Sequence, residues 1–145
     1  GERVLVASSA GDGFIIPEAD VIAQTRSGKQ ILNVKDDIRA TICVPVTGDH
    51  VAVVGKNRKL LIFPLEELPE MTRGKGVRLQ TYRDKGAVLS DVKCLALEHG
   101  LSWKENGGRT RTETAEALRE DGYVHKRAGA GRMAPRGFPR DNRFN

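Results

Sequence analysis

The sequence is poor in the residues on which several classes of protein depend. Its only cysteines are Cys43 and Cys94, too few for a disulfide-bonded scaffold or a four-cysteine zinc site. Its three histidines show neither metal-ligand spacing nor the arrangement of a catalytic triad. The longest apolar runs, such as 51–54 and 60–63, have the length of a strand, so we expect no segment to cross a membrane.

Both cysteines lie inside short apolar runs, which is typical of buried thiols in a reducing compartment. Residues 1–10 lack the basic start and long apolar stretch of a secretory signal. We therefore expect a cytoplasmic protein with both thiols in its core.

Positive charge is concentrated in the second half of the chain. Residues 1–69 contain 8 lysines and arginines against 9 acidic residues, whereas residues 70–145 contain 16 against 10. This asymmetry, within a net charge of +5, favours a polyanionic partner, most simply nucleic acid. The basic residues fall among turns and alternating strands and not along an amphipathic helix, which argues against a membrane surface.

A strand–turn–strand pattern that ends at a proline occurs twice, and Pro17 and Pro64 are 47 residues apart. Each pattern predicts a β-hairpin, and a short acidic connector follows each proline. The first copy comprises strands at 4–7 and 14–16 and the connector 18–20; the second comprises strands at 50–54 and 60–63 and the connector 66–67.

Each copy continues into a basic glycine turn, at 25–29 and at 72–76, and closes on a strand that contains a cysteine, at 41–44 and at 92–95. The two cysteines are thus expected at equivalent core positions. A weaker third copy has a hairpin over 101–112, one or two helical turns over 114–121 and a basic glycine segment at 126–132. The Pro- and Arg-rich stretch 133–145 is expected to be irregular.

A period of about 46–50 residues made of short strands predicts the blades of a propeller-like array, in which neighbouring blades cover each other. Aromatic residues make up only 5% of the chain and no Trp-Asp dipeptide occurs, which disfavours WD40 and kelch propellers. The predicted class is all-β. We expect one domain, 1–145, with blades at about 3–48 and 49–98, a degenerate blade at about 99–132 and a basic tail at 133–145.

The segments 53–63, 68–80 and 136–144 resemble the last blades of the C-terminal domain in the A subunit of bacterial DNA topoisomerase IV, a type IIA topoisomerase. The resemblance implies a β-pinwheel, in which adjacent blades exchange strands, with about three blades here and a short helical turn in the last. The related gyrase domain carries the box Gln-Arg-Arg-Gly-Gly-Lys-Gly. Neither 24–30 nor 71–76 matches that box in full, which favours topoisomerase IV and leaves gyrase as the alternative.

The resemblance also implies a function. In this family the domain binds and bends duplex DNA along the basic outer edge of the blades, and so supports substrate selection for ATP-dependent decatenation and relaxation during chromosome segregation. The catalytic tyrosine, ATP and Mg²⁺ belong to other parts of a heterotetramer with the B subunit. We therefore expect a non-catalytic segment with no cofactor or metal of its own, in a cytoplasmic, nucleoid-associated enzyme with no membrane contact.

Basic glycine turns suit a phosphate backbone because glycine permits close approach and can offer amide groups, while lysine and arginine add charge. Phosphate contacts of this kind give affinity and not sequence readout. The predicted DNA-binding residues are Arg26, Lys29, Arg73, Lys75 and Arg78, then Lys56, Arg58, Lys59, Arg83 and Lys85, and more weakly Arg132, because the third turn has lost its lysine.

Two other interpretations concern the same residues. Gly74 and Lys75 do not form a Walker A loop, which needs Gly-x-x-x-x-Gly-Lys-Ser/Thr between a strand and a helix. A protein-interaction platform for an acidic partner is the alternative from another class. DNA binding would be favoured if one outer edge contained residues 26–29, 56–59 and 73–85. The platform would be favoured if charges of both signs were mixed along one rim.

Overall fold

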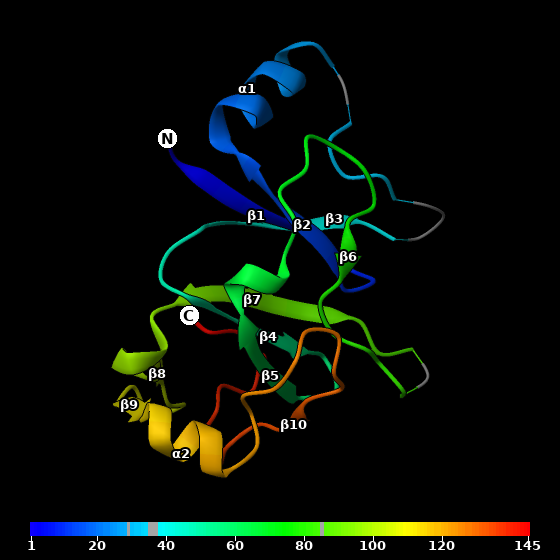
Figure 1. Ribbon diagram of the computed structural model, residues 1–145. Helices are drawn as coiled ribbons and strands as arrows, with labels where there is room; N and C mark the ends of the chain where they lie inside the picture. The colour runs from blue at the N-terminus through cyan, green and yellow to red at the C-terminus, as the bar shows by residue number, and fades with distance from the viewer. Residues whose placement is uncertain (29, 35–37, 85) are drawn as a thin grey trace.

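The computed structural model describes residues 1–28, 30–34, 38–84 and 86–145, and within these ranges the chain is mostly short β-strands (Figure 1). The strands are β1 (Arg3–Ser8), β2 (Asp12–Pro17), β3 (Ala40–Pro45), β4 (His50–Gly55), β5 (Lys59–Pro64), β6 (Val77–Arg78), β7 (Leu89–Leu95), β8 (Leu101–Lys104), β9 (Thr110–Glu113) and β10 (Arg132–Met133). The helices are α1 (Glu18–Arg26), α2 (Ala115–Glu120) and the short 3₁₀ turns η1 (Leu65–Glu67) and η2 (Leu97–His99).

Each complete sheet takes its last strand from the following repeat. One four-stranded sheet has the order β3-β1-β2-β6 and the other the order β10-β5-β4-β7, while β8 and β9 form a two-stranded sheet. Gly13 pairs with Val77 and Leu60 pairs with Arg132, so β6 and β10 lie in the sheet of the preceding unit. This exchange of strands confirms the β-pinwheel expected from the sequence.

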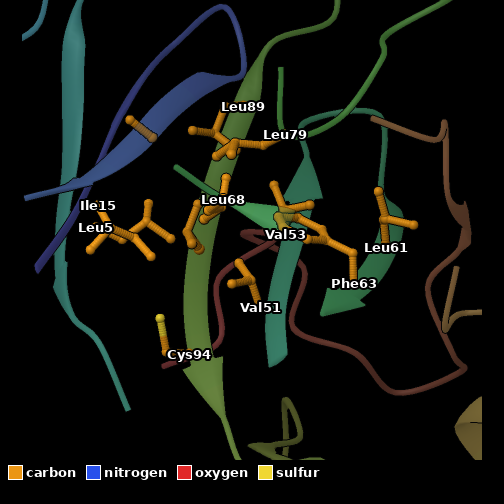
Figure 2. Close-up of a cluster of buried hydrophobic side chains, with 12 residues drawn as sticks. Leu5, Ile15, Val51, Val53, Leu61, Phe63, Leu68, Leu79, Leu89 and Cys94 are labelled. Carbon is orange, nitrogen blue, oxygen red and sulfur yellow. The ribbon is translucent and has the colours of Figure 1, made fainter. Parts of the chain in front are cut away.

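The core lies between the two four-stranded sheets, as Figure 2 shows. Alternation along the strands sends Leu5 and Ala7 of β1 towards Val51 and Val53 of β4, and all four side chains are fully buried. Burying a leucine or valine side chain contributes about 1.5–3 kcal/mol, so this layer holds the two sheets face to face. The opposite face of β4 packs on a second cluster that includes Trp103.

The exchanged strands repeat the same backbone hydrogen bonds. Leu79 N–H donates to Gly11 O over 2.7 Å, and Ala134 N–H donates to Arg58 O over 2.8 Å. Gly11 and Arg58 are 47 residues apart, and both have positive φ, 90° and 65°. The hairpin turns of the two units are therefore equivalent down to the residue that must adopt the left-handed conformation.

One helix was missed by the sequence reasoning. Residues 18–26 were expected to be an acidic connector leading into a basic turn, and they form α1 (Figure 1). Glu18 and Asp20 lie in its first turn and Arg26 in its last, which suits the helix dipole. None of its residues is buried, so it lacks the apolar stripe that signals a helix. The helix expected in the third unit is confirmed as α2, and Thr114 Oγ1 caps it by accepting from Ala117 N–H.

The prediction that the two cysteines occupy equivalent core positions is wrong. Cys43 lies opposite Val6 on β1, whereas Cys94 lies opposite Val51, the counterpart of Val4. The residue of β7 that corresponds to Cys43 is therefore Val92, two positions away from Cys94. Cys94 is buried between the sheets. Cys43 is exposed because it lies beside Val6, on a face of the first sheet that no other sheet covers in the described part of the chain.

This difference predicts that one thiol reacts first. Partial desolvation, with the nearby charge of Glu18, raises the pKa of the Cys43 thiol, and burial raises that of Cys94. Labelling by an aromatic disulfide at pH 8 should therefore be slow for both. Exposure should nevertheless let Cys43 react well before Cys94, giving one fast equivalent in the folded chain and two in denaturant. Cys43→Ser should remove the fast equivalent; two equal rates in the folded wild type would contradict the assignment.

Strand exchange also predicts a strict need for glycine before β6. Gly76 has φ +83°, and a Cβ there would collide with Gly13 O in the neighbouring strand. Gly108 has a similar φ of +90°, but its Cβ would meet nothing within 4 Å, so Gly108→Ala is a matched control. Gly108→Ala should cost about 1–2 kcal/mol of unfolding free energy. Gly76→Ala should cost at least about 2 kcal/mol more because the strand must also move. Urea denaturation with similar midpoints for both variants would refute this.

Candidate nucleic-acid interface

The outer edges of the two sheets are formed by the exchanged strands. β3 and β7, at the other ends of the strand orders, approach each other, which leaves β6 and β10 as the edges remote from that contact. Two segments form these edges: the one that runs into and includes β6, and the one that runs into and includes β10. We call their exposed cations the outer-edge group. In the first sheet it contains Arg73, Lys75 and Arg78, three of the residues predicted from the sequence.

A buried carboxylate lies close to two of these cations. Asp12 faces Arg78 across the β2–β6 pair, and its side chain is only 6% exposed. Arg78 Nε lies 3.8 Å and Lys75 Nζ 3.9 Å from the Asp12 carboxylate, while their side chains stay 52% and 70% exposed. Contacts this long and this exposed contribute little to stability, so both cations can still meet a second anion.

The glycines of the basic turn serve the fold and not the ligand. Gly74 N–H donates to Ile31 O over 2.9 Å, and Gly74 O accepts from Asn33 N–H over 2.7 Å. Residue 76 must be glycine because a Cβ there would collide with β2. The same holds for residue 131, where a Cβ would lie 2.6 Å from Leu60 O. The expectation that this turn offers amide groups to phosphate is therefore wrong for Gly74, whose amide is already bonded.

Arg26 lies beside the same edge. It is exposed in the last turn of α1, and Gln24 Nε2, two residues earlier, donates to Thr72 O over 2.6 Å. This bond ties the end of the helix to the segment that carries Arg73. Lys29, predicted with Arg26, lies outside the described residues.

A second set of predicted cations gathers at a hairpin turn. Lys56 lies in the turn between β4 and β5, Lys59 is the first residue of β5, and Arg83 lies in the connection from β6 to β7. Asp84 joins the two segments, accepting from Asn57 Nδ2 over 3.0 Å and lying 3.9 Å from Lys59 Nζ. We call Lys56, Lys59 and Arg83 the turn group; Lys85, predicted with them, lies outside the described residues.

Arg58 is placed differently from the other predicted cations. Its Nη1 donates to Pro139 O and to Asn142 Oδ1, each over 2.9 Å, and its Nη2 donates to Phe138 O over 3.1 Å. The guanidinium also lies over the Phe138 ring, 5.8 Å from its centroid. These contacts use the guanidinium to hold the C-terminal segment, so the geometry gives Arg58 a structural role.

The second outer edge contains one predicted cation and two that were missed, the exposed Lys126 and the half-buried Arg127. Arg132 begins β10 and is exposed. Arg127 occupies the place of Arg73, because His125 N–H donates to Ile62 O as Met71 N–H donates to Ile15 O. Its Nη1 donates to Arg78 O over 2.7 Å, which links the outer edges of the two sheets. Aligning the glycines of the two segments pairs Arg73 with Ala128, so only the backbone hydrogen bonds identify Arg127 as its counterpart.

Tyr82 ties the two sheets together behind Arg78. A Cβ at Gly11 would lie 2.7 Å from Tyr82 Cε2, and a Cβ at Gly55 would lie 2.8 Å from its Cε1. The ring thus fits between the hairpin turns of both units only because these positions are glycine. Burial raises the pKa of the Tyr82 phenol well above its usual range, and the charge of Asp12 adds to the rise.

Known proteins share this arrangement. The family described as "DNA gyrase C-terminal domain, beta-propeller" matches residues 2–42 and 49–93. The chain belongs to this family. The DNA topoisomerase 4 A subunit of Rickettsia bellii is 45% identical over 142 residues, and that of Caulobacter vibrioides is 46% identical over 144. These matches cover 98% and 99% of this chain but 18% of each relative, so the chain spans about a fifth of the length of those relatives.

Solved structures of this family agree in fold. The Escherichia coli ParC C-terminal domain superposes with a TM-score of 0.77 at 23% identity, covering 96% of this chain and 58% of that one. A gyrase A C-terminal domain superposes with a TM-score of 0.69 at 14% identity, covering 93% and 47%. In the described part of the chain, no helix has the length and apolar character needed to span a bilayer.

The contacts of Arg58 predict a loss of stability when it is removed. Arg58→Ala should lower the unfolding free energy of this domain by about 2–4 kcal/mol, because several hydrogen bonds from a charged donor disappear together. Lys56→Ala in the same turn removes an exposed cation and should change it by no more than about 0.5 kcal/mol. Urea denaturation of the two variants distinguishes them; equal midpoints would show that the Arg58 contacts do not hold the C-terminal segment.

Proposed function

We propose that this domain binds duplex DNA through the sugar–phosphate backbone and bends it, as part of a topoisomerase IV A subunit. The observation that carries the proposal is the outer-edge group. Arg73, Lys75 and Arg78 are exposed on one strand segment, and Arg127 connects that segment to the next sheet, where Arg132 is exposed. Several cations along two adjoining edges suit a polyanion that passes from one sheet to the next.

Backbone contact explains the binding better than base readout. The outer edges present two-residue strands flanked by lysine and arginine, and among the described residues no recognition helix accompanies them. Contacts on successive sheets that are not coplanar would require the duplex to curve. Bending a site of a few helical turns costs on the order of 1–6 kcal/mol, which additional phosphate contacts can offset.

In the whole protein, this binding would help to select DNA substrates for ATP-dependent decatenation and relaxation. Catalysis, ATP and Mg²⁺ would belong to the rest of the A subunit and to the B subunit of a cytoplasmic, nucleoid-associated heterotetramer. The names of the relatives support topoisomerase IV over gyrase as the parent enzyme. The protein-interaction platform is less favoured, because the outer-edge cations adjoin one another and Asp12, the carboxylate within 3.9 Å of Lys75 and Arg78, is buried.

The test removes the first outer edge. The triple variant Arg73→Ala, Lys75→Ala, Arg78→Ala should weaken binding to a labelled 40-base-pair duplex and flatten its salt dependence. The log–log slope should fall by about 0.9 for each phosphate that the variant no longer binds, and fluorescence anisotropy at several salt concentrations measures both quantities. The control triple Arg3→Ala, Arg111→Ala, Arg119→Ala removes the same charge elsewhere. Equal affinity and slope in the two triples would overturn the proposal.

A further inference from the structure

The C-terminal segment is a fixed strap and not a loose tail. We call residues 134–145 the strap. Phe138 and Phe144 are buried in an edge-to-face cluster with Trp103. Besides the Arg58 contacts, Ser90 Oγ donates to Asn142 O over 2.7 Å, and Phe144 N–H donates to Asp91 Oδ2 over 2.8 Å.

The strap occupies the place that the β6–β7 connection occupies one unit earlier. Both segments follow an exchanged strand and bond at once to the preceding hairpin turn, through Leu79 in one case and Ala134 in the other. The β6–β7 connection then reaches the turn of the second sheet, where Lys56 N–H donates to Val88 O over 2.8 Å. The strap likewise reaches the turn of the third sheet, where Arg140 N–H donates to Asn106 Oδ1 over 3.3 Å.

The strap fixes three cations that were not among the predicted site residues. Arg136, Arg140 and Arg143 are exposed, and within the described ranges no carboxylate lies within ion-pair distance of their guanidinium groups. Asn142 Nδ2 donates to Lys56 O over 3.5 Å, which brings the strap against the hairpin turn that carries the turn group. The strap's own acid, Asp141, accepts from Arg143 N–H over 3.2 Å.

We propose that the strap is an additional phosphate-binding element, in which Arg136, Arg140 and Arg143, together with the adjoining turn group, extend the DNA contact towards the third sheet. This inference rests on the proposed function. Because Arg58 and the aromatic cluster already hold the strap, its cations are presented at a smaller entropic cost than those of a mobile tail. Its aromatic side chains face inward, so it offers charge without the apolar core of a protein–protein interface.

The decisive variant is Arg136→Ala, Arg140→Ala, Arg143→Ala in the 145-residue chain. The control is again the triple Arg3→Ala, Arg111→Ala, Arg119→Ala. The log–log salt slope for the 40-base-pair duplex should be lower in the strap variant than in this control, by about 0.9 for each phosphate contact that the three strap arginines make. At 0.1 M salt, one such contact corresponds to a loss of affinity of roughly eightfold. Unfolding by urea should be unchanged, because these side chains are exposed.

A second variant tests the seating of the strap without removing charge. Arg58→Lys keeps the charge but loses the forked contact to residues 138–142, so the strap arginines must be ordered on binding. Affinity should fall severalfold while the salt slope stays that of the wild type. Limited proteolysis shows whether the strap is released in this variant. If it is released and the affinity for DNA is unchanged, the proposal that the bound strap contributes to DNA binding is overturned.

The outcomes separate the two proposals. If the strap triple matches the control while the outer-edge triple weakens binding, the strap inference fails and the proposed function stands. If neither triple differs from the control, the proposed function fails with it. If the strap triple loses binding to labelled poly-glutamate but binds the duplex as the control does, the strap is a surface for an acidic protein and the inference is overturned.

Discussion

Pairing between strands of successive repeats is the interaction on which the rest of this domain depends. A hairpin such as β1–β2 has one free edge, and the next unit supplies the strand that closes it. This pairing has two consequences. Leu79 and Ala134 each form a hydrogen bond to the preceding hairpin turn, and a glycine must precede each added strand. Neither sheet is complete within its own segment of sequence.

The same pairing brings the charges together. The segment that closes the first sheet carries Arg73, Lys75 and Arg78, and the segment that closes the second carries Arg127 and Arg132. Each group of cations is therefore positioned by the neighbouring unit, with Asp12 of the recipient sheet close to two of them. Rearrangement of one sheet would move the cations supplied by the next, so the stability of the array and its surface charge pattern are linked.

Much of the fold could be predicted because hairpins with a proline at the end and a repeat near 47 residues are local signals. α1 was missed because a helix with no buried residue shows no apolar periodicity in the sequence. The register of Cys43 was missed because the segment from β2 to β3 is two residues shorter than the equivalent segment from β5 to β7. Composition identifies basic residues but not their contacts, so Arg58 looked like Lys56, and Arg127 was hidden by a one-residue offset between glycine segments. The DNA-binding role of the remaining residues stays a prediction.

Strand exchange also sets an order of events during synthesis. β2 ends at Pro17, but the strand that completes its sheet, β6, is made only some 60 residues later, and β5 waits similarly for β10. At about 5–20 residues per second, each new sheet has an unpaired edge for roughly 3–12 s while the chain leaves the ribosome. An unpaired edge of this kind can join the wrong strand, and neighbouring repeats of similar sequence are the nearest wrong strands available.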